Sequence, residues 1–130
     1  LEKTGLAELR HQPVTRLSGG ELQRTFLAQL LCQNTRLMLL DEPTNHLDLV
    51  YQKQVFDLIQ NWIKETGGSV VSVVHDLSLA RLYGTKALLL HKGRMVAKGD
   101  AREVLSPAYL DEVYEMDVRG WFRTLGEQWK

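Results

Sequence analysis

The sequence predicts an α/β fold built around parallel strands, because helical and strand-like segments alternate along the chain. Residues 18–33 carry apolar side chains at helical spacing, residues 37–40 form a short apolar run, and residues 48–66 again have a helical pattern. A second apolar strand is predicted at 70–74, followed by a short helix at about 77–83. Strands that alternate with helices in this way are typical of a parallel sheet with right-handed helical connections.

The ends of the two long helices carry start and stop signals. Ser18 followed by Glu21 is the capping-box pattern, so the first helix should begin at Ser18. Asp48 is a favoured residue for the cap of the second helix, and Gly67-Gly68 is expected to end it.

The apolar residues of these segments are expected to share one core. In the helices they are Leu22, Phe26, Leu27, Leu30 and Leu31, then Tyr51, Val55, Leu58, Ile59, Trp62 and Ile63. The first strand is continuously apolar, which predicts that helices cover it on both faces, and the second is expected to be buried as well. Cys32 is expected to be a small packed residue rather than a nucleophile.

The second half of the chain predicts a hairpin and further helices. Residues 87–91 and 94–98, joined at Lys92-Gly93, have the pattern of an antiparallel hairpin. Asp100 and Glu103 then form another capping pattern, and Ser106-Pro107 places proline at a favoured first helical position. Residues 117–130 show no clear period, so no element is predicted there.

Length and charge limit the possible functions. The chain has 130 residues, which is typical of one globular domain or a piece of one, and a single Cys excludes an internal disulfide. Its 16 Lys and Arg balance 16 Asp and Glu, so it lacks the basic surplus that nucleic-acid binding needs. The sequence contains no apolar run of about 20 residues that could span a bilayer, and its first residues do not have the pattern of a signal peptide.

Ionisable residues follow both predicted strands. Asp41-Glu42 ends the first and His75-Asp76 follows the second, and ligands of parallel α/β sheets bind at this edge. An acidic residue after a buried strand holds Mg²⁺ in nucleoside triphosphatases, and a second carboxylate can act as a base toward water. A histidine there can donate a hydrogen bond to a phosphate. The alternative is that the strands end in polar loops and His75 has a structural role only.

The glycines after Ser18 have two interpretations. Ser18-Gly19-Gly20 is either a structural cap or a site where an anion reaches the free N–H groups at the positive end of the helix. Glycine costs helix stability, roughly 1 kcal/mol per residue in the interior, which favours the anion, plausibly a phosphate. For Asp48, the alternative to a site role is a helix cap alone.

Three motifs give the sequence a family resemblance. LSGGE at 17–21, LMLLDEPTNHLD at 37–48 and VVHDLSLA at 73–80 resemble, in order and spacing, the signature, the Walker B motif with its D-loop, and the switch histidine of an ATP-binding-cassette (ABC) nucleotide-binding domain. ALLLHKGRMVAKGDAREVL at 87–105 is similar to the segment after the switch histidine in ABC importers. The resemblance therefore implies part of a P-loop NTPase-like core with a C-terminal hairpin and helices.

The resemblance implies a role for each matching residue, with ATP and Mg²⁺ as cofactors. Asp41 would hold Mg²⁺, Glu42 would polarise the attacking water and His75 would contact the γ-phosphate. The residues that would face a nucleotide held by the opposite subunit, or lie at that dimer seam, are Ser18, Gly19, Gly20, Glu21 and Asp48.

One motif of the family does not occur in this sequence. No G-x-x-x-x-G-K-[ST] loop is present, so the residues that grip the β- and γ-phosphates are lacking. We therefore expect the C-terminal half of a longer domain, with little ATPase activity alone and an unpaired strand edge. The expected parts are the end of a helical signature subdomain at 1–34, a catalytic core at 35–100 and a helical extension at 101–130.

The resemblance also indicates a class of ABC protein. LSPAYLDEVYEMDV at 105–118 resembles importers of iron-siderophore complexes, haem or cobalamin, which implies a second nucleotide-binding domain and transmembrane permease subunits as partners, at the inner face of the cell membrane. DEPTNHLD also suits a translation-factor type or another non-transport ABC ATPase, whereas HDLSLA favours an importer. A non-catalytic docking module is the third alternative.

Overall fold

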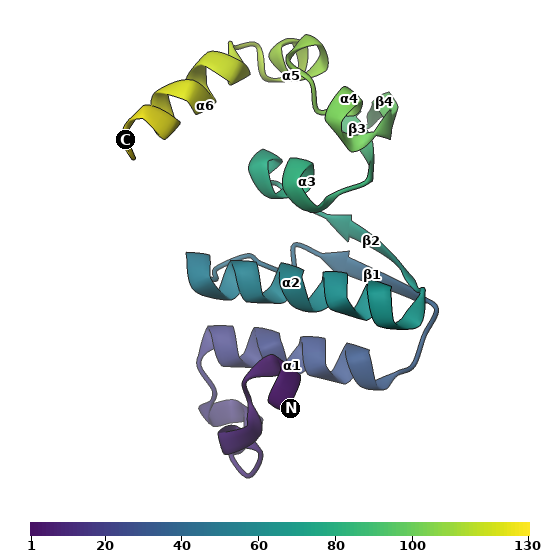
Figure 1. Cartoon of the computed structure of the whole chain (residues 1–130), viewed down its shortest axis with the longest axis vertical. Helices are drawn as coiled ribbons and strands as arrows, with labels where there is room; N and C mark the ends of the chain where they lie inside the picture. The colour runs from purple at the N-terminus through teal and green to yellow at the C-terminus, as the bar shows by residue number, and fades with distance from the viewer. The chain divides into compact units, whose positions relative to one another are not determined.

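The chain packs as two compact units with separate cores. The structure, a computed structural model, describes all residues from Leu1 to Lys130, and the units are Leu1–His75 and Asp76–Lys130. Figure 1 shows the order of helices and strands within each unit. The C-terminal hairpin and helices bury their own apolar side chains, which gives the second unit a core of its own. The three parts at 1–34, 35–100 and 101–130 divide the chain by motif, and they stay a prediction.

The first unit combines short 3-10 turns, two long helices and two strands. In Figure 1, α2 lies alongside α1, and the strands lie beyond α2. The elements are η1 (Glu2–Thr4), η2 (Ala7–Leu9), η3 (Val14–Arg16), α1 (Gly19–Cys32), β1 (Leu37–Asp41), α2 (Leu49–Thr66) and β2 (Ser69–Val73).

The strands β1 and β2 form the predicted parallel pair. Leu37 lies opposite Ser69 and Asp41 lies opposite Val73, so both strands reach the same edge. The sheet has two strands, and each therefore has one edge without a strand neighbour, as expected. The prediction that both faces are covered is wrong for these residues. Met38 is buried on the helix side, whereas Leu39 is 67% exposed on the other face, because α2 packs against one face only.

The predicted helix ends are confirmed. The Ser18 side chain accepts the backbone N–H of Glu21, while the Glu21 carboxylate accepts that of Ser18, which is the reciprocal capping box. Asp48 caps α2 by accepting the N–H of Tyr51 at 3.0 Å. Gly67 ends α2 with φ +67°, a conformation that glycine adopts without strain.

The packing of α1 differs from the sequence prediction. Phe26 is exposed, and the side chains that α1 buries are Leu27 and Arg24. The Arg24 guanidinium lies 4.3 Å from the centre of the Tyr51 ring, and Nη1 donates to the Thr4 carbonyl at 3.2 Å. An arginine thus takes a core position because its planar head stacks on an aromatic ring. Cys32 is exposed, so the expected packed cysteine is wrong.

The core of the first unit comes mainly from α2 and β1. Trp62 is 8% exposed, which confirms its predicted core position. The other buried apolar residues are Leu6, Leu27, Met38, Leu40, Leu47, Val55, Phe56 and Ile59.

The second unit contains the predicted hairpin and the helices that cover it. Its elements are α3 (Leu77–Tyr83), β3 (Lys86–His91), β4 (Arg94–Asp100), α4 (Ala101–Val104), α5 (Pro107–Tyr114) and α6 (Val118–Glu127). Lys92 and Gly93 both have positive φ, as a two-residue hairpin turn requires. The core residues are Leu89, Val104, Leu105, Leu110 and Val118.

Two predictions for the second unit are wrong. Asp100 makes no side-chain cap at α4, because its carboxylate accepts a hydrogen bond from Lys86 at 3.1 Å instead. Residues 118–127 form α6, although no element was expected there, and the Asp117 side chain caps it by accepting the N–H of Gly120 at 2.8 Å. None of the helices is long and apolar enough to cross a membrane.

Candidate active site at the carboxyl ends of the parallel strands

The backbone pairing of the two strands continues one residue past the end of β1. The Glu42 N–H donates to the Val73 carbonyl at 3.0 Å, and Glu42 has φ +46°. This bond holds Glu42 beside the end of β2, two residues before His75. The left-handed backbone at a non-glycine residue is uncommon and costs strain, so the surrounding turn must hold it in place.

Glu42 and His75 meet across this edge of the sheet. His75 Nε2 lies 2.7 Å from Glu42 Oε1, a distance at which an Nε2–H group donates a hydrogen bond to the carboxylate. The His75 side chain is 79% exposed and that of Glu42 is 33% exposed. The structure therefore brings these two predicted site residues together, and both remain accessible to a ligand.

Asp41 lies next to Glu42 but on the uncovered side of the sheet. It continues the alternation of β1, in which Leu37 and Leu39 are exposed and the residues between them are buried. The structure contains no cluster of three or more His, Cys, Asp or Glu side chains that could bind a metal ion. Mg²⁺ is often held by one or two carboxylates together with water and substrate phosphates, and an exposed Asp41 fits that mode of binding.

The two best-formed cavities of the structure do not include this group of residues. Two cavities, of about 420 and 370 Å³, lie near the 3-10 turns at the start of the chain, and neither is lined by Asp41, Glu42 or His75. Asp41 and His75 are exposed at the sheet edge, and Glu42 is partly exposed there.

The turn from Pro43 to Asp48 connects this edge to α2. Pro43 and Thr44 are buried, the Asn45 N–H donates to the Glu42 carbonyl at 3.0 Å, and the Leu47 N–H donates to the Thr44 carbonyl at 3.2 Å. These bonds fix the backbone that presents Glu42 on one side and begins α2 on the other. Asp48 is exposed and acts as the cap of α2, which is the structural role that the sequence left open.

The start of α1 presents free backbone N–H groups beside the polar side chains of Ser18 and Glu21. Ser18 is exposed there, and the Glu21 carboxylate accepts the Ser18 backbone N–H at 2.7 Å. This backbone hydrogen bond, with a second one to the Ser18 side chain, lowers the pKa of Glu21 from its ordinary value of 4.5. Glu21 therefore works as a capping residue and places its negative charge at the positive end of α1.

Gly19 and Gly20 adopt backbone conformations that alanine also adopts, and neither position excludes a Cβ. Neither has a positive φ. A Cβ added to Gly19 would meet nothing within 4 Å, and one added to Gly20 would lie 3.4 Å from Leu47 Cδ2, which is ordinary contact. The fold would accept alanine at both positions, so neither packing nor backbone conformation explains the choice of glycine.

A side chain that the sequence analysis missed links α1 to the Glu42 turn. Gln23 Nε2 donates to the Pro43 carbonyl at 2.9 Å, and Gly20 lies beside Leu47 in the same turn. Gln52 adds a hydrogen bond from α2 to the Leu47 carbonyl at 3.0 Å. The start of α1 and the strand-end residues are therefore held as one framework. The only sequence signal for Gln23 is its place one helical turn after Gly19.

Comparison with known proteins shows similarity to ABC transporter proteins. Residues 1–45 match a family model described as ABC transporter. The chain is 41% identical over 118 residues to the iron(3+)-hydroxamate import ATP-binding protein FhuC of Bacillus subtilis (strain 168). That match covers 91% of this chain and 44% of the relative, so the chain spans less than half the length of the relative.

Solved structures agree with this similarity. A structure described as a metal-chelate type ABC transporter, in an inward-facing conformation, has a TM-score of 0.81 and 30% identity, covering 88% of this chain and 45% of that one. A dimeric ATP-binding cassette, MJ0796, bound to ADP and Pi has a TM-score of 0.66 and 31% identity, covering 78% of this chain and 45% of that one. The expected α/β fold, part of an NTPase-like core, is confirmed by these similarities.

Proposed function

We propose that this chain, as part of the nucleotide-binding domain of an ABC transporter, supplies catalytic residues for ATP hydrolysis. In this proposal, the hydrolysis drives uptake of an iron complex or a similar metal chelate. The observation that carries the proposal is the 2.7 Å contact between His75 and Glu42 at the carboxyl ends of two parallel strands. The contact supports the proposal because a carboxylate that could act as a base and an N–H donor lie together at the edge where parallel α/β sheets bind ligands.

Glu42 has the role of a base toward the attacking water. Its carboxylate is partly exposed and lies at the edge of the sheet, where a water molecule and a phosphate can both reach it. The hydrogen bond from His75 holds one carboxylate oxygen in place, and the bond from the Glu42 N–H to Val73 holds the backbone. A positioned base of this kind contributes about 10²- to 10⁴-fold to the rate.

His75 supplies a hydrogen-bond donor to the transferring phosphate. Its Nε2 faces Glu42 in the structure, and the exposed ring is free of packing constraints that would prevent it from turning toward a ligand. A donor aimed at the γ-phosphate stabilises the charge that develops there during transfer.

Asp41 is the residue of this chain that would hold Mg²⁺. When bound with ATP, the ion neutralises charge on the phosphates. Asp41 contributes a carboxylate at the exposed end of β1, directly before the base.

The start of α1 is proposed to bind the nucleotide held by an opposite subunit. Ser18 and Gly19 lie at the positive end of a 14-residue helix, and Gly20 lets an oxyanion approach its backbone without a Cβ in the way. Asp48 lies at the seam in this proposal, with Glu21 ordering the helix start. Dimerisation is supported by the dimeric cassette that this chain resembles.

The remaining parts of the site are proposed to come from other polypeptide. The chain has no G-x-x-x-x-G-K-[ST] loop to cradle the β- and γ-phosphates, and Asp41 and His75 are exposed at the strand ends. The proposed partners are a second nucleotide-binding domain and the permease subunits of an importer, at the inner face of the cell membrane. Iron-siderophore complexes, haem and cobalamin are the proposed class of cargo, which the similarity to an iron(3+)-hydroxamate import protein supports.

The test is reconstitution of ATP hydrolysis. The chain would be coexpressed with a polypeptide that carries the missing glycine-lysine loop of a related cassette, and Mg²⁺-dependent phosphate release would be measured on the purified complex. Glu42→Gln should reduce the rate by about 10²-fold or more, because the base is lost while shape is kept. Glu65→Gln is the matched control, since Glu65 makes an exposed ion pair with Lys3 away from the strand ends and such pairs contribute little.

The outcome separates catalysis from docking. Hydrolysis that depends on Glu42 but not on Glu65 supports the proposal. A stable complex without hydrolysis, or with equal rates for wild type and Glu42→Gln, would contradict it and favour a non-catalytic docking module.

A further inference from the structure

Arg24 is a nearly buried cation that no carboxylate of the chain neutralises. The residue is 9% exposed and makes no ion pair. Nη1 is the one nitrogen of its guanidinium with a hydrogen-bond partner, the Thr4 carbonyl at 3.2 Å, while Nε is buried without any partner. Removing a charge from water is costly unless the charge is paired, so Arg24 lacks a counter-charge.

The packing of Arg24 defines which kind of partner is missing. The Tyr51 ring lies against the flat face of the guanidinium, 4.3 Å from Cζ, whereas hydrogen-bond acceptors bind such a group in its plane. Nη1 already donates to Thr4, which leaves Nε and Nη2 without acceptors. Two neighbouring N–H groups of arginine form a fork that matches the two oxygens of a carboxylate. The missing partner is therefore a group of that shape.

A cavity of about 370 Å³ lies beside this arginine. Arg24 lines the cavity with the little surface that it keeps, together with three apolar and two amide side chains, Leu27, Val55, Leu58, Gln54 and Asn61. The volume is within the range of small-molecule sites, about 300–1,000 Å³, whose walls are mostly apolar with a few polar groups. The cavity can therefore hold a ligand with a charged head and a carbon chain.

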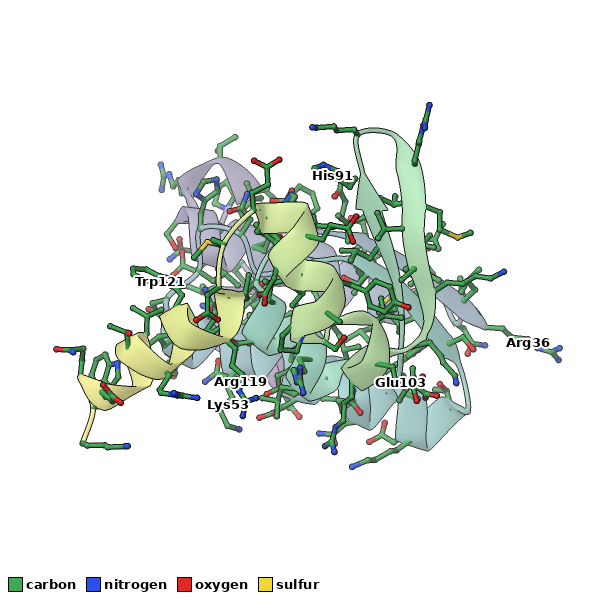
Figure 2. All side chains as sticks on the ribbon, turned by 90° about the horizontal axis from the view of Figure 1, so that it is seen from above. Arg36, Lys53, His91, Glu103, Arg119 and Trp121 are labelled. Atoms are coloured by element: carbon green, nitrogen blue, oxygen red, sulfur yellow. The ribbon has the colours of Figure 1, made fainter.

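The other charged side chains at this cavity do not supply the missing partner. Asp57 is paired with Lys53, one helical turn earlier on α2 (Figure 2). Lys3 has an ion pair of its own, and Glu2 is exposed, so water solvates its carboxylate. A bound anion would therefore take a position beside Arg24 that no carboxylate of the chain occupies.

We propose that this cavity binds a small organic carboxylate. Its two oxygens pair with the Arg24 guanidinium, and its apolar part lies against Leu27 and Leu58. The buried charge favours an anion, and the apolar wall favours a carbon chain over a strongly hydrated ion such as phosphate. None of Asp41, Glu42 and His75 lines the cavity, so its occupancy does not depend on the proposed ATP hydrolysis.

NMR of the arginine side chain tests the proposal. The probe is sodium butyrate, added to the ¹⁵N-labelled chain at constant ionic strength, and the Nε–H signal of Arg24 is assigned by its absence in Arg24→Lys. We expect this signal to shift with a Kd of about 1 mM, as suits so small a ligand. Butyramide, which has nearly the same shape without the charge, should bind at least tenfold more weakly, because hydrogen bonds to a charged acceptor are stronger.

Two tryptophan substitutions test the cavity without replacing Arg24, whose loss would also remove its packing on Tyr51. Gln54→Trp places a large ring at the cavity wall and should weaken butyrate binding at least tenfold. Lys64→Trp is the matched control, because it adds the same ring to the exposed surface of α2 away from the cavity and should leave binding unchanged. Circular dichroism checks that both variants are folded.

The outcomes separate a ligand site from an arginine that only packs. A butyrate-dependent shift that Gln54→Trp weakens and Lys64→Trp does not supports the proposal. No shift up to about 50 mM butyrate would overturn it, because water would then satisfy the guanidinium. Equal binding of butyrate and butyramide, equal weakening by both tryptophan variants, or a shift with inorganic phosphate alone would also overturn it, because an organic carboxylate would then not be what the cavity recognises.

Discussion

Replacement of Gly19 or Gly20 by alanine should separate the stability of α1 from its function. Both residues lie in the first turn of α1 without a positive φ, and a Cβ at either position meets open space or ordinary contact. Alanine is a better helix former by about 0.8–1 kcal/mol in a helix interior and by less at an end. We therefore expect the free energy of unfolding to stay the same or to rise by up to about 1 kcal/mol.

Thermal unfolding followed by circular dichroism at 222 nm measures this effect. A gain of 1 kcal/mol corresponds to about 4–8 °C in Tm for a unit of this size. The matched control is Gly67→Ala, which also meets no atom within 4 Å but has φ +67°, so a side chain there costs about 1–2 kcal/mol. Tm should thus fall for Gly67→Ala and not for the other two variants.

The same alanine variants should lose function in the reconstituted domain. A methyl group at Gly19 or Gly20 stands where an oxyanion would approach the free N–H groups of α1, so Mg²⁺-dependent ATP hydrolysis should drop by about tenfold or more. If Gly19→Ala lowers Tm as much as Gly67→Ala does, the glycine is structural. If it keeps full hydrolysis, the phosphate-binding interpretation is refuted.

Three further substitutions test other parts of the argument. Gly68→Ala should lower the free energy of unfolding by about 1–3 kcal/mol, because its Cβ would lie 2.7 Å from Trp62 Cζ3. Most of that loss should disappear in a Trp62→Leu background, and urea titration of the variants measures both effects. Gln23→Leu should cost about 1 kcal/mol and lower kcat with little change in KM, because the bond to the Pro43 carbonyl aligns the strand-end turn; an unchanged kcat would speak against this linkage. Because the pKa of Glu21 in the folded chain is below 4.5, its contribution to stability is present above pH 4.5 and is lost as the pH falls through the folded pKa. Glu21→Gln should therefore flatten this part of a plot of Tm against pH. An unchanged plot would contradict the capping role of the Glu21 carboxylate.

Local patterns in the sequence predicted the elements well. The capping box at Ser18, the cap at Asp48 and the hairpin turn at Lys92-Gly93 were all correct, because each depends on bonds between residues a few positions apart. The α6 helix was missed although Val118, Trp121, Phe122 and Leu125 follow helical spacing. Its apolar face is exposed, and the interruption by glycines weakens the pattern.

Contacts between distant segments needed the tertiary structure. That Arg24 rather than Phe26 would be buried depends on Tyr51 and Thr4, which are far away in sequence. The bond from Gln23 to Pro43 likewise depends on how α1 packs against the turn. No periodicity carries this information, since it records which side of an element is apolar and not what lies against it.

The sequence by itself determined the order of the strands and of the main helices as far as residue 114, the caps at Ser18 and Asp48, and the acidic and histidine residues that end the two strands. Only the tertiary structure decided that Glu42 and His75 are in contact, that one face of the sheet is uncovered, and that neither Gly19 nor Gly20 excludes a Cβ. The physical reason is range: capping and periodicity act within a few residues, whereas the pairing of β1 with β2 joins residues about 30 positions apart and alone sets the geometry at their ends.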